Sequence, residues 1–233
     1  DAVRYWAAST SFGKDSVISE DKVQAGAKLV TKLWNVAQFS QRFLEGYRPS
    51  PSPTPLPPAK LGEEGGAGVG EGVHLSLADR WILSRLARLT ADTTRLMEEY
   101  QFGEAGRQLF EFFWSEYCDW YLELIKPALQ DPAHGDGPGA RQTLVETLET
   151  TMRLLHPFMP FLTEEIWQTI PHQGDSIVIQ SQVDAAKIQD PFKSLKKSGF
   201  RSGQEVLEDL IQFANTHNIS FYAMDPDSYL RYV

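Results

Sequence analysis

The sequence predicts an all-α fold, an antiparallel helical bundle. Apolar residues recur every three or four positions through most of residues 20–170, which is the period of amphipathic helices. Proline- and glycine-rich stretches divide this region into four or five helical segments, and no strand pattern lies between them. A chain of 233 residues with 42% hydrophobic residues can bury the core of one large domain or two small ones. Consecutive amphipathic helices of this kind pack as a bundle.

The composition excludes several classes of protein. The net charge of −9 argues against a surface that attracts nucleic acid everywhere, so such binding would need a local basic patch. Cys118 is the only cysteine, which excludes an internal disulfide and fits a reducing compartment. The sequence shows neither an apolar run of bilayer length nor a signal-peptide pattern. We therefore expect a cytoplasmic protein without a membrane partner.

The first long helix is predicted over residues 20–45. Ser19, Glu20 and Asp21 mark its start, and Gly46 ends it. On a helical wheel the apolar residues occupy one broad arc, while a second arc of about 80° forms a continuous stripe. The stripe consists of Lys28, Lys32, Asn35, Phe39 and Arg42.

This stripe combines three kinds of side chain that a single-stranded nucleic acid site requires. Lysine and arginine supply cations for phosphate oxygens, asparagine supplies an amide for a base edge, and phenylalanine supplies a ring for base stacking. Five basic residues against two acidic ones give residues 21–48 a net charge of +3. The alternative is a solvated helix face that carries one exposed aromatic ring.

The second helix is predicted from Leu77 to about Tyr100, after a flexible proline- and glycine-rich linker at 49–74. Four arginines against one aspartate again give residues 80–95 a charge of +3. Arg88 and Arg95 lie opposite the apolar face and are candidate phosphate contacts. A plain solvated surface is the alternative for these arginines.

Three further helices complete the predicted bundle. The third begins near Gly103 and is expected to stop at Pro127, and its dense aromatic residues are assigned to the core. The fourth covers about 140–155 and is broken by the two prolines of "HPFMPF". The short fifth helix covers "LTEEIWQTI", with Thr163, Glu164 and Glu165 in its N-terminal turn.

The C-terminal tail, residues 176–233, has a different pattern. It predicts a helix over 204–216 followed by an apolar strand over 219–224, which is typical of an α/β unit. A second strand at "SIVIQS", residues 176–181, would be its pairing partner. The tail has no predicted function.

No residues show the spacing of a catalytic or metal site. The five histidines are not paired at metal-ligand spacing, and Glu164 and Glu165 point about 100° apart on a helix. Asp119 is assigned a structural hydrogen bond to a neighbouring helix in preference to catalysis. We expect no catalytic, cofactor-binding or metal-binding residue in this chain.

Five short motifs in this sequence resemble motifs of one class of enzymes. "DAVRYW", residues 1–6, resembles the motif that opens the tRNA-binding part of several class I aminoacyl-tRNA synthetases. Four later motifs resemble the valyl-tRNA synthetase family, in that family's order: "KLWNVAQF" at 32–39, "LADRWILSRL" at 77–86, "FEFFWSEYCDWYLELIKP" at 110–127 and "LLHPFMPFLTEEIWQ" at 154–168. The resemblance covers roughly residues 1–179 and ends at about Ser181.

The resemblance implies a bundle over residues 20–175 that holds the anticodon stem-loop of tRNA(Val). Lys28 and Lys32 would then contact phosphates, Asn35 a base edge and Phe39 an unstacked base. Residues 1–19 would follow the family's catalytic domain, which is a further expected partner.

The family's HIGH and KMSKS signatures and its editing domain are missing from this sequence. We therefore interpret the chain as a fragment that has no catalytic activity alone, whereas the parent enzyme would use ATP to attach valine to tRNA. A protein-interaction module derived from a synthetase and an inert fused fragment are the alternatives.

Overall fold

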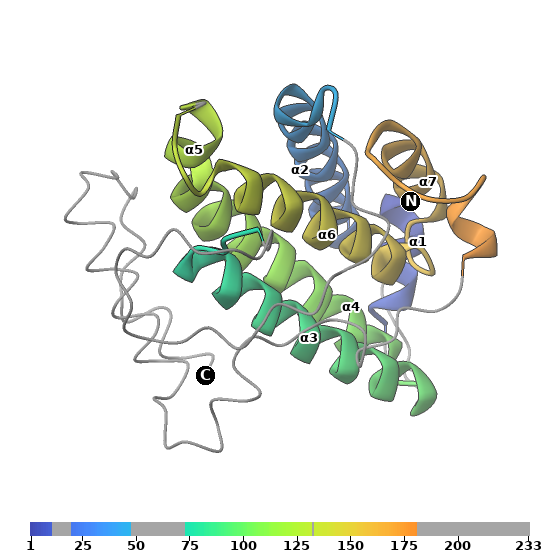
Figure 1. Ribbon diagram of the computed structural model, residues 1–233. Helices are drawn as coiled ribbons and strands as arrows, with labels where there is room; N and C mark the ends of the chain where they lie inside the picture. The colour runs from blue at the N-terminus through green and yellow to red at the C-terminus, as the bar shows by residue number, and fades with distance from the viewer. Residues whose placement is uncertain (11–19, 48–72, 132, 181–233) are drawn as a thin grey trace, which may run out of the picture.

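The computed structural model describes residues 1–10, 20–47, 73–131 and 133–180 (Figure 1). Within these ranges every regular element is helical, which confirms the predicted fold class. The elements are α1 (Ala2–Ala8), α2 (Glu20–Leu44), α3 (Leu77–Glu98), α4 (Phe102–Glu111), the π-helix η1 (Phe112–Tyr121), α5 (Leu122–Gln130), α6 (Gly137–Leu155), α7 (Pro160–Thr169) and the 3₁₀ helix η2 (Ile177–Ile179).

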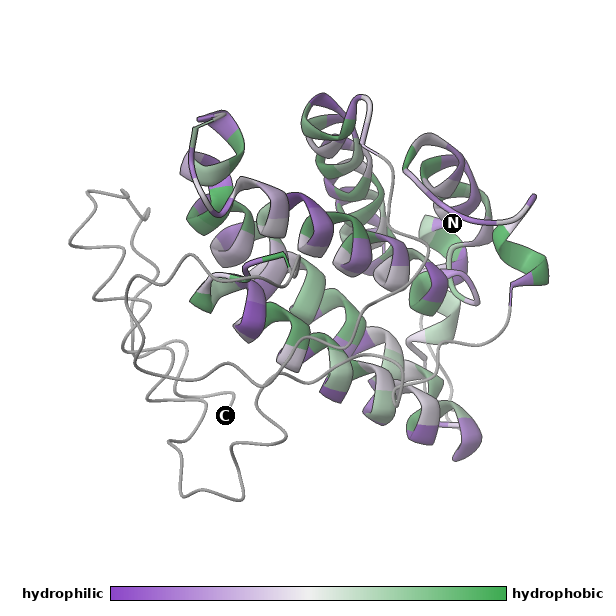
Figure 2. Cartoon of the chain, viewed as in Figure 1, coloured by the Kyte–Doolittle hydropathy of each residue, from purple (hydrophilic) through white to green (hydrophobic). Residues whose placement is uncertain are grey.

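The helices pack in an antiparallel arrangement. In Figure 1 the chain follows α3 in one direction, returns along α4, η1 and α5, and reverses again along α6. Helix α3 packs on α4, η1 and α6, while α2 packs on α1, α6 and α7. Figure 2 shows hydrophobic and hydrophilic residues on different sides of these helices, as the periodicity predicts. The largest fully buried side chains come from several helices and include Leu33, Leu86, Phe113, Leu148 and Trp167.

Local chemistry sets the end of α2 and the start of α3. Gly46 has a φ of +76°, the left-handed conformation that ends many helices, as predicted for α2. At the start of α3, the side chain of Ser76 accepts a hydrogen bond from the Asp79 backbone N–H, while the Asp79 carboxylate accepts one from the Ser76 backbone. This capping box satisfies two N–H groups that the helix leaves unpaired.

The short helix α1 rests directly on α2. A Cβ atom at Gly26 of α2 would lie only 2.8 Å from the carbonyl oxygen of Ala2. Tyr5 further anchors α1 by donating a hydrogen bond of 3.0 Å to the carbonyl oxygen of Gly106 in α4. The absence of a side chain at Gly26 therefore lets the two helix backbones approach closely.

The prediction that Pro127 ends the third helix is wrong. Helix α5 continues through Pro127 to Gln130, and the N–H of Asp131 donates to the Pro127 carbonyl oxygen at 3.1 Å. Proline removes one intrahelical hydrogen bond. The burial of Ala128 and Leu129 immediately after it offsets this loss.

Two predictions near residue 170 also differ from the structure. Helix α7 starts two residues early, with Pro160 as its first residue, so Thr163, Glu164 and Glu165 lie beyond its N-terminal positions. Residues 177–179 form a 3₁₀ helix in place of the predicted strand, since the Glu164 carboxylate accepts hydrogen bonds from the Ser176 hydroxyl and the Ile177 N–H at 3.0 Å each. The predicted linker at 49–74, apart from its last two residues, and the predicted tail elements at 204–216 and 219–224 lie outside the described residues.

Candidate nucleic-acid interface

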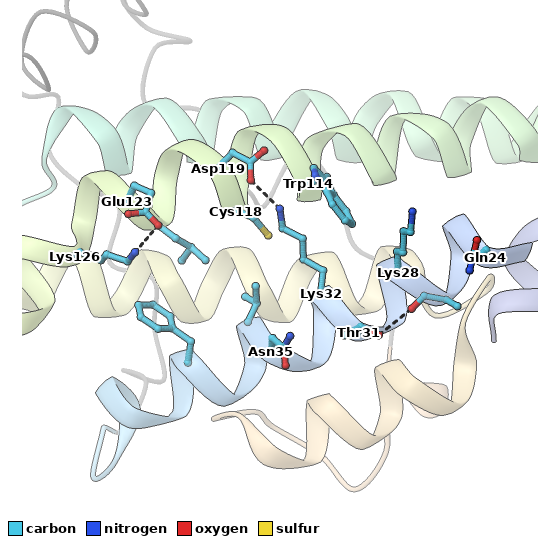
Figure 3. Close-up of a pocket in the computed structure, with 14 residues that line it drawn as sticks. Gln24, Lys28, Thr31, Lys32, Asn35, Trp114, Cys118, Asp119, Glu123 and Lys126 are labelled. Atoms are coloured by element: carbon cyan, nitrogen blue, oxygen red, sulfur yellow. Dashed lines mark hydrogen bonds and ion pairs between the residues drawn. The ribbon is translucent and has the colours of Figure 1, made fainter. Parts of the chain in front are cut away.

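A groove of about 730 Å³ runs between α2 on one side and η1 and α5 on the other (Figure 3). Four of the predicted stripe residues line it: Lys28, Lys32, Asn35 and Phe39. The opposite wall is formed by Trp114, Cys118, Asp119, Leu122, Glu123 and Lys126. The side chains of Lys28 and Asn35 are exposed, and those of Lys32 and Phe39 are half-buried.

Arg42, the fifth stripe residue, does not line this groove. It borders a second hollow of about 550 Å³ between the C-terminal ends of α2 and α7, together with Gln38, Gln41 and Ile170. The helical wheel places Arg42 in line with the stripe, but the neighbouring helices divide the stripe between two hollows.

The two candidate arginines of α3 lie outside both hollows. Both side chains are exposed, as predicted. Arg95 forms ion pairs on its own helix surface, at 3.6 Å from Asp92 and 3.1 Å from Glu99. Arg88 has no ion pair with any residue that the structure describes. The two arginines therefore differ in how readily each would accept a new anionic partner.

Lys32 is the most closely held cation of the groove. Its Nζ lies 2.8 Å from Oδ1 of Asp119 and 4.0 Å from the centre of the Trp114 ring. Figure 3 shows this ammonium group reaching from α2 across to the opposite wall. The ion pair confirms the structural role that was predicted for Asp119.

Phe39 has one part in the core and one part in the groove. Its ring meets Phe43 edge to face, with 5.0 Å between centroids, and packs against buried residues of the bundle. The ammonium group of Lys126 lies 5.9 Å from the ring centroid on the groove side. The ring is thus held in place and remains accessible along the groove.

None of the residues that form the opposite wall of the groove was predicted as a site residue, and Trp114, Asp119 and Lys126 are the three whose side chains contact Lys32 or Phe39. Trp114 is one of the aromatic residues that the sequence predicts in the core, yet its side chain is only half-buried. Within η1, Phe113, Tyr117 and Tyr121 are fully buried at intervals of four, whereas Trp114, one residue after Phe113, is turned toward the groove that it lines. Asp119, Glu123 and Lys126 recur at helical spacing, which was the available signal for a charged face opposite the α2 stripe.

The groove carries a small positive charge in an acidic protein. Lys28, Lys32 and Lys126 supply three cations against the carboxylates of Asp119 and Glu123. Burial raises the pKa of the Cys118 thiol well above its ordinary value, so this thiol is neutral and not a nucleophile. The arrangement offers charges, an amide and rings for binding.

No group of three or more histidine, cysteine, aspartate or glutamate side chains in the described ranges is placed to hold a metal ion. No described helix has the length and apolar character needed to cross a bilayer.

Relatives of the chain are valine–tRNA ligases from several bacteria. The enzyme of Latilactobacillus sakei is 41% identical over 182 residues, which are 78% of this chain and 19% of that protein. The enzyme of Enterococcus faecalis is 37% identical over 217 residues, or 91% of this chain and 22% of that protein. The enzyme of Bacillus subtilis is 39% identical over 184 residues, or 77% of this chain and 18% of that protein. The chain therefore spans about one fifth of the length of these relatives.

A protein family described as the anticodon-binding domain of tRNA ligase matches residues 79–220. The match passes beyond Ser181, so the expectation that the resemblance ends there is wrong. It includes all of α3 except its first two residues and every element from α4 to η2, and with them the wall of the groove that carries Trp114 and Asp119. Sequence, helical fold and relatives agree: the chain belongs to the family of anticodon-binding domains of tRNA ligases, and it is similar to that part of valine–tRNA ligases.

Proposed function

We propose that this chain binds the anticodon stem-loop of tRNA(Val) in the groove between α2 and the η1–α5 wall. The observation that carries the proposal is the groove itself, in which Lys28, Lys32, Asn35 and Phe39 lie together. A single-stranded RNA loop presents phosphates, base edges and unstacked bases, and this set of side chains can contact each of them.

Each residue has a role that follows from its chemistry. Lys28 is exposed at one end of the groove and contacts a phosphate. Asn35 is exposed about two turns further along α2 and pairs with a base edge through its amide. Phe39 is held by Phe43 and stacks on an unpaired base, because a fixed ring loses little conformational entropy on binding. Lys126 adds a third cation near that ring.

The chain would act as the tRNA-orienting part of a longer enzyme. The relatives are valine–tRNA ligases of which this chain spans about one fifth. The sequence contains no HIGH or KMSKS signature, so the catalytic domain that uses ATP to attach valine to tRNA(Val) is expected as a partner. Binding of the anticodon arm by this domain would direct the acceptor end of the tRNA toward that active site.

A titration of labelled RNA tests the proposal. Fluorescence anisotropy would compare the wild-type chain with K28A and K32A, using a hairpin with the sequence of the tRNA(Val) anticodon arm, at two salt concentrations. Each phosphate contact that is lost should weaken binding and reduce the slope of log K against log salt by about 0.7 for an unpaired strand.

The control variant is R153A, because Arg153 lies on α6 outside the groove and pairs with Glu149 on the same helix. It should leave both affinity and slope unchanged. If the wild-type chain does not bind the hairpin, or if K28A and K32A bind it as tightly as wild type, the groove is not the binding site.

A further inference from the structure

Trp114 occupies a position in the groove that suits a stacking platform. Its ring stacks on Phe110, one turn earlier in the same helical segment, with 5.3 Å between centroids and 16° between planes. Phe110 in turn contacts Tyr5 of α1 at 6.5 Å. These contacts hold the indole in one orientation while it lines the groove.

In the free protein a cation covers this ring. Lys32 Nζ lies 4.0 Å from the ring centre and is held there by the carboxylate of Asp119 at 2.8 Å. The side chains of Lys32 and Asp119 keep 24% and 33% of their surface exposed. An ion pair with this degree of exposure is weak and can exchange one partner for another in solution.

We propose that Trp114 is an RNA-stacking residue and that Asp119 holds Lys32 over it until RNA binds. The inference rests on the proposed function. A phosphate of the bound loop takes the place of Asp119 as the partner of Lys32, and the lysine leaves the indole. An unpaired base then stacks on the uncovered ring, which Phe110 keeps in place.

Asp119 is therefore an internal competitor for the phosphate. Asp119 pairs with Lys32 in the free state. Separating this pair costs free energy, which offsets part of the free energy that Lys32 gains from contacting a phosphate. After exchange, its unpaired carboxylate also repels nearby phosphates. Removing the negative charge should strengthen RNA binding, in contrast to the loss expected when a site residue is removed.

The first test uses D119N in the full chain, with the same anticodon-arm hairpin as probe. Affinity should rise by about two- to fivefold, the strength typical of a partly exposed ion pair. The affinity should also depend more steeply on salt concentration. In wild type, the carboxylate that Lys32 leaves behind takes up a counterion, which offsets part of the counterion release from the RNA, whereas D119N leaves no such carboxylate. E123Q is the matched control, since Glu123 lines the same groove but pairs with Lys126.

A double-mutant cycle separates the exchange from a general effect of charge. In the K32M background, D119N should improve binding no more than E123Q does, because the lysine that it releases is gone. A gain from D119N that is as large in the K32M background as in wild type would overturn the role of Asp119.

The second test removes the ring. W114L should weaken binding by about 5- to 100-fold without changing the salt dependence, and W114F should restore most of the loss because a base stacks on any aromatic face. Circular dichroism would verify that each variant folds. Equal affinities of W114L and wild type would overturn the role of Trp114.

A ¹⁹F NMR measurement keeps the Trp114 ring in place, so it remains decisive even where W114L fails to fold. The chain has 6 tryptophans, so labelling with 5-fluorotryptophan gives a ¹⁹F spectrum in which W114F identifies the Trp114 resonance. Addition of the hairpin should shift that resonance, and an unshifted resonance at saturation would overturn the inference. If wild type binds and responds to K28A but not to changes at 114 and 119, only this inference fails; if wild type does not bind, the proposed function fails with it.

Discussion

The phenol of Tyr121 donates a hydrogen bond of 2.8 Å to the carboxylate of Asp79, and both side chains are fully buried. This bond joins the first turn of α3 to the end of η1, which is the segment that forms one wall of the groove. Asp79 also closes the capping box with Ser76. The start of α3 and the position of the groove wall therefore depend on the same carboxylate.

Replacement of Tyr121 by phenylalanine should lower the free energy of unfolding by about 1–3 kcal/mol, because a buried carboxylate loses its partner. Urea denaturation would measure the change. Y117F is the matched control: Tyr117 is equally buried, but its hydroxyl donates a longer bond of 3.3 Å to a neutral carbonyl, that of Leu144. A loss for Y117F as large as that for Y121F would contradict the role assigned to Asp79.

Asp79 should also make stability depend on pH. Burial raises the pKa of this carboxyl above its ordinary value of 3.8, although hydrogen bonds from Ser76 and Tyr121 oppose the shift. The folded state then binds the proton more tightly than the unfolded state, so the stabilisation is complete below the unfolded pKa and is lost as the pH rises through the folded pKa. Urea denaturation from about pH 4 to about pH 7 should show wild type losing stability relative to D79N. Parallel profiles for the two proteins would refute this linkage.

Replacement of Phe39 by leucine should weaken binding of the anticodon-arm hairpin by about 1–3 kcal/mol, since leucine fills the inner part of the site but cannot stack on a base. Anisotropy titration gives the affinity, and a thermal melt checks the fold. Phe161 supplies the control, because it is 73% exposed and lies outside the groove. F161L should bind as wild type, and a similar loss in both variants would show that Phe39 has no special role.

The two arginines of α3 should respond differently if their face meets the RNA backbone. R88A is expected to weaken binding and to reduce the slope of log K against log salt by about the amount that one phosphate contact contributes. R95A should have the smaller effect, because Arg95 already pairs with Asp92 and Glu99. Titrations at several salt concentrations would distinguish the two, and an unchanged slope for both would assign this face to solvent alone.

The close contact between α1 and α2 predicts a steric penalty at Gly26. G26A would place a methyl group 2.8 Å from the carbonyl oxygen of Ala2, so α1 must shift, at a cost of about 1–3 kcal/mol in unfolding free energy. G135A provides the comparison, because nothing lies within 4 Å of the added methyl group there. Urea denaturation should separate the two variants, and equal stability would mean that the added methyl group at residue 26 causes no steric penalty.

Several features of the fold could be read from residues close together in the chain. The period of Leu29, Leu33, Val36 and Ala37 defines the buried face of α2, and Gly46 defines its end. These features depend on interactions within one helix, for which sequence spacing is sufficient. The same spacing correctly placed Lys28, Lys32, Asn35 and Phe39 on a common face.

Other features required contacts between segments that are distant in the chain. The length of α5 beyond Pro127 depends on burial against the bundle, and the 3₁₀ conformation of residues 177–179 depends on hydrogen bonds to Glu164. Local propensity describes neither, because a tertiary contact can outweigh a preference of one or a few kcal/mol.

The sequence by itself determined the helical class, the family resemblance and the stripe on α2. The tertiary structure decided what faces that stripe. It separated Arg42 from the other stripe residues, and it placed Trp114 and Asp119 around Lys32 although they lie more than eighty residues along the chain. The physical reason is that helical periodicity specifies which side chains share one helix surface, whereas packing specifies which two surfaces meet.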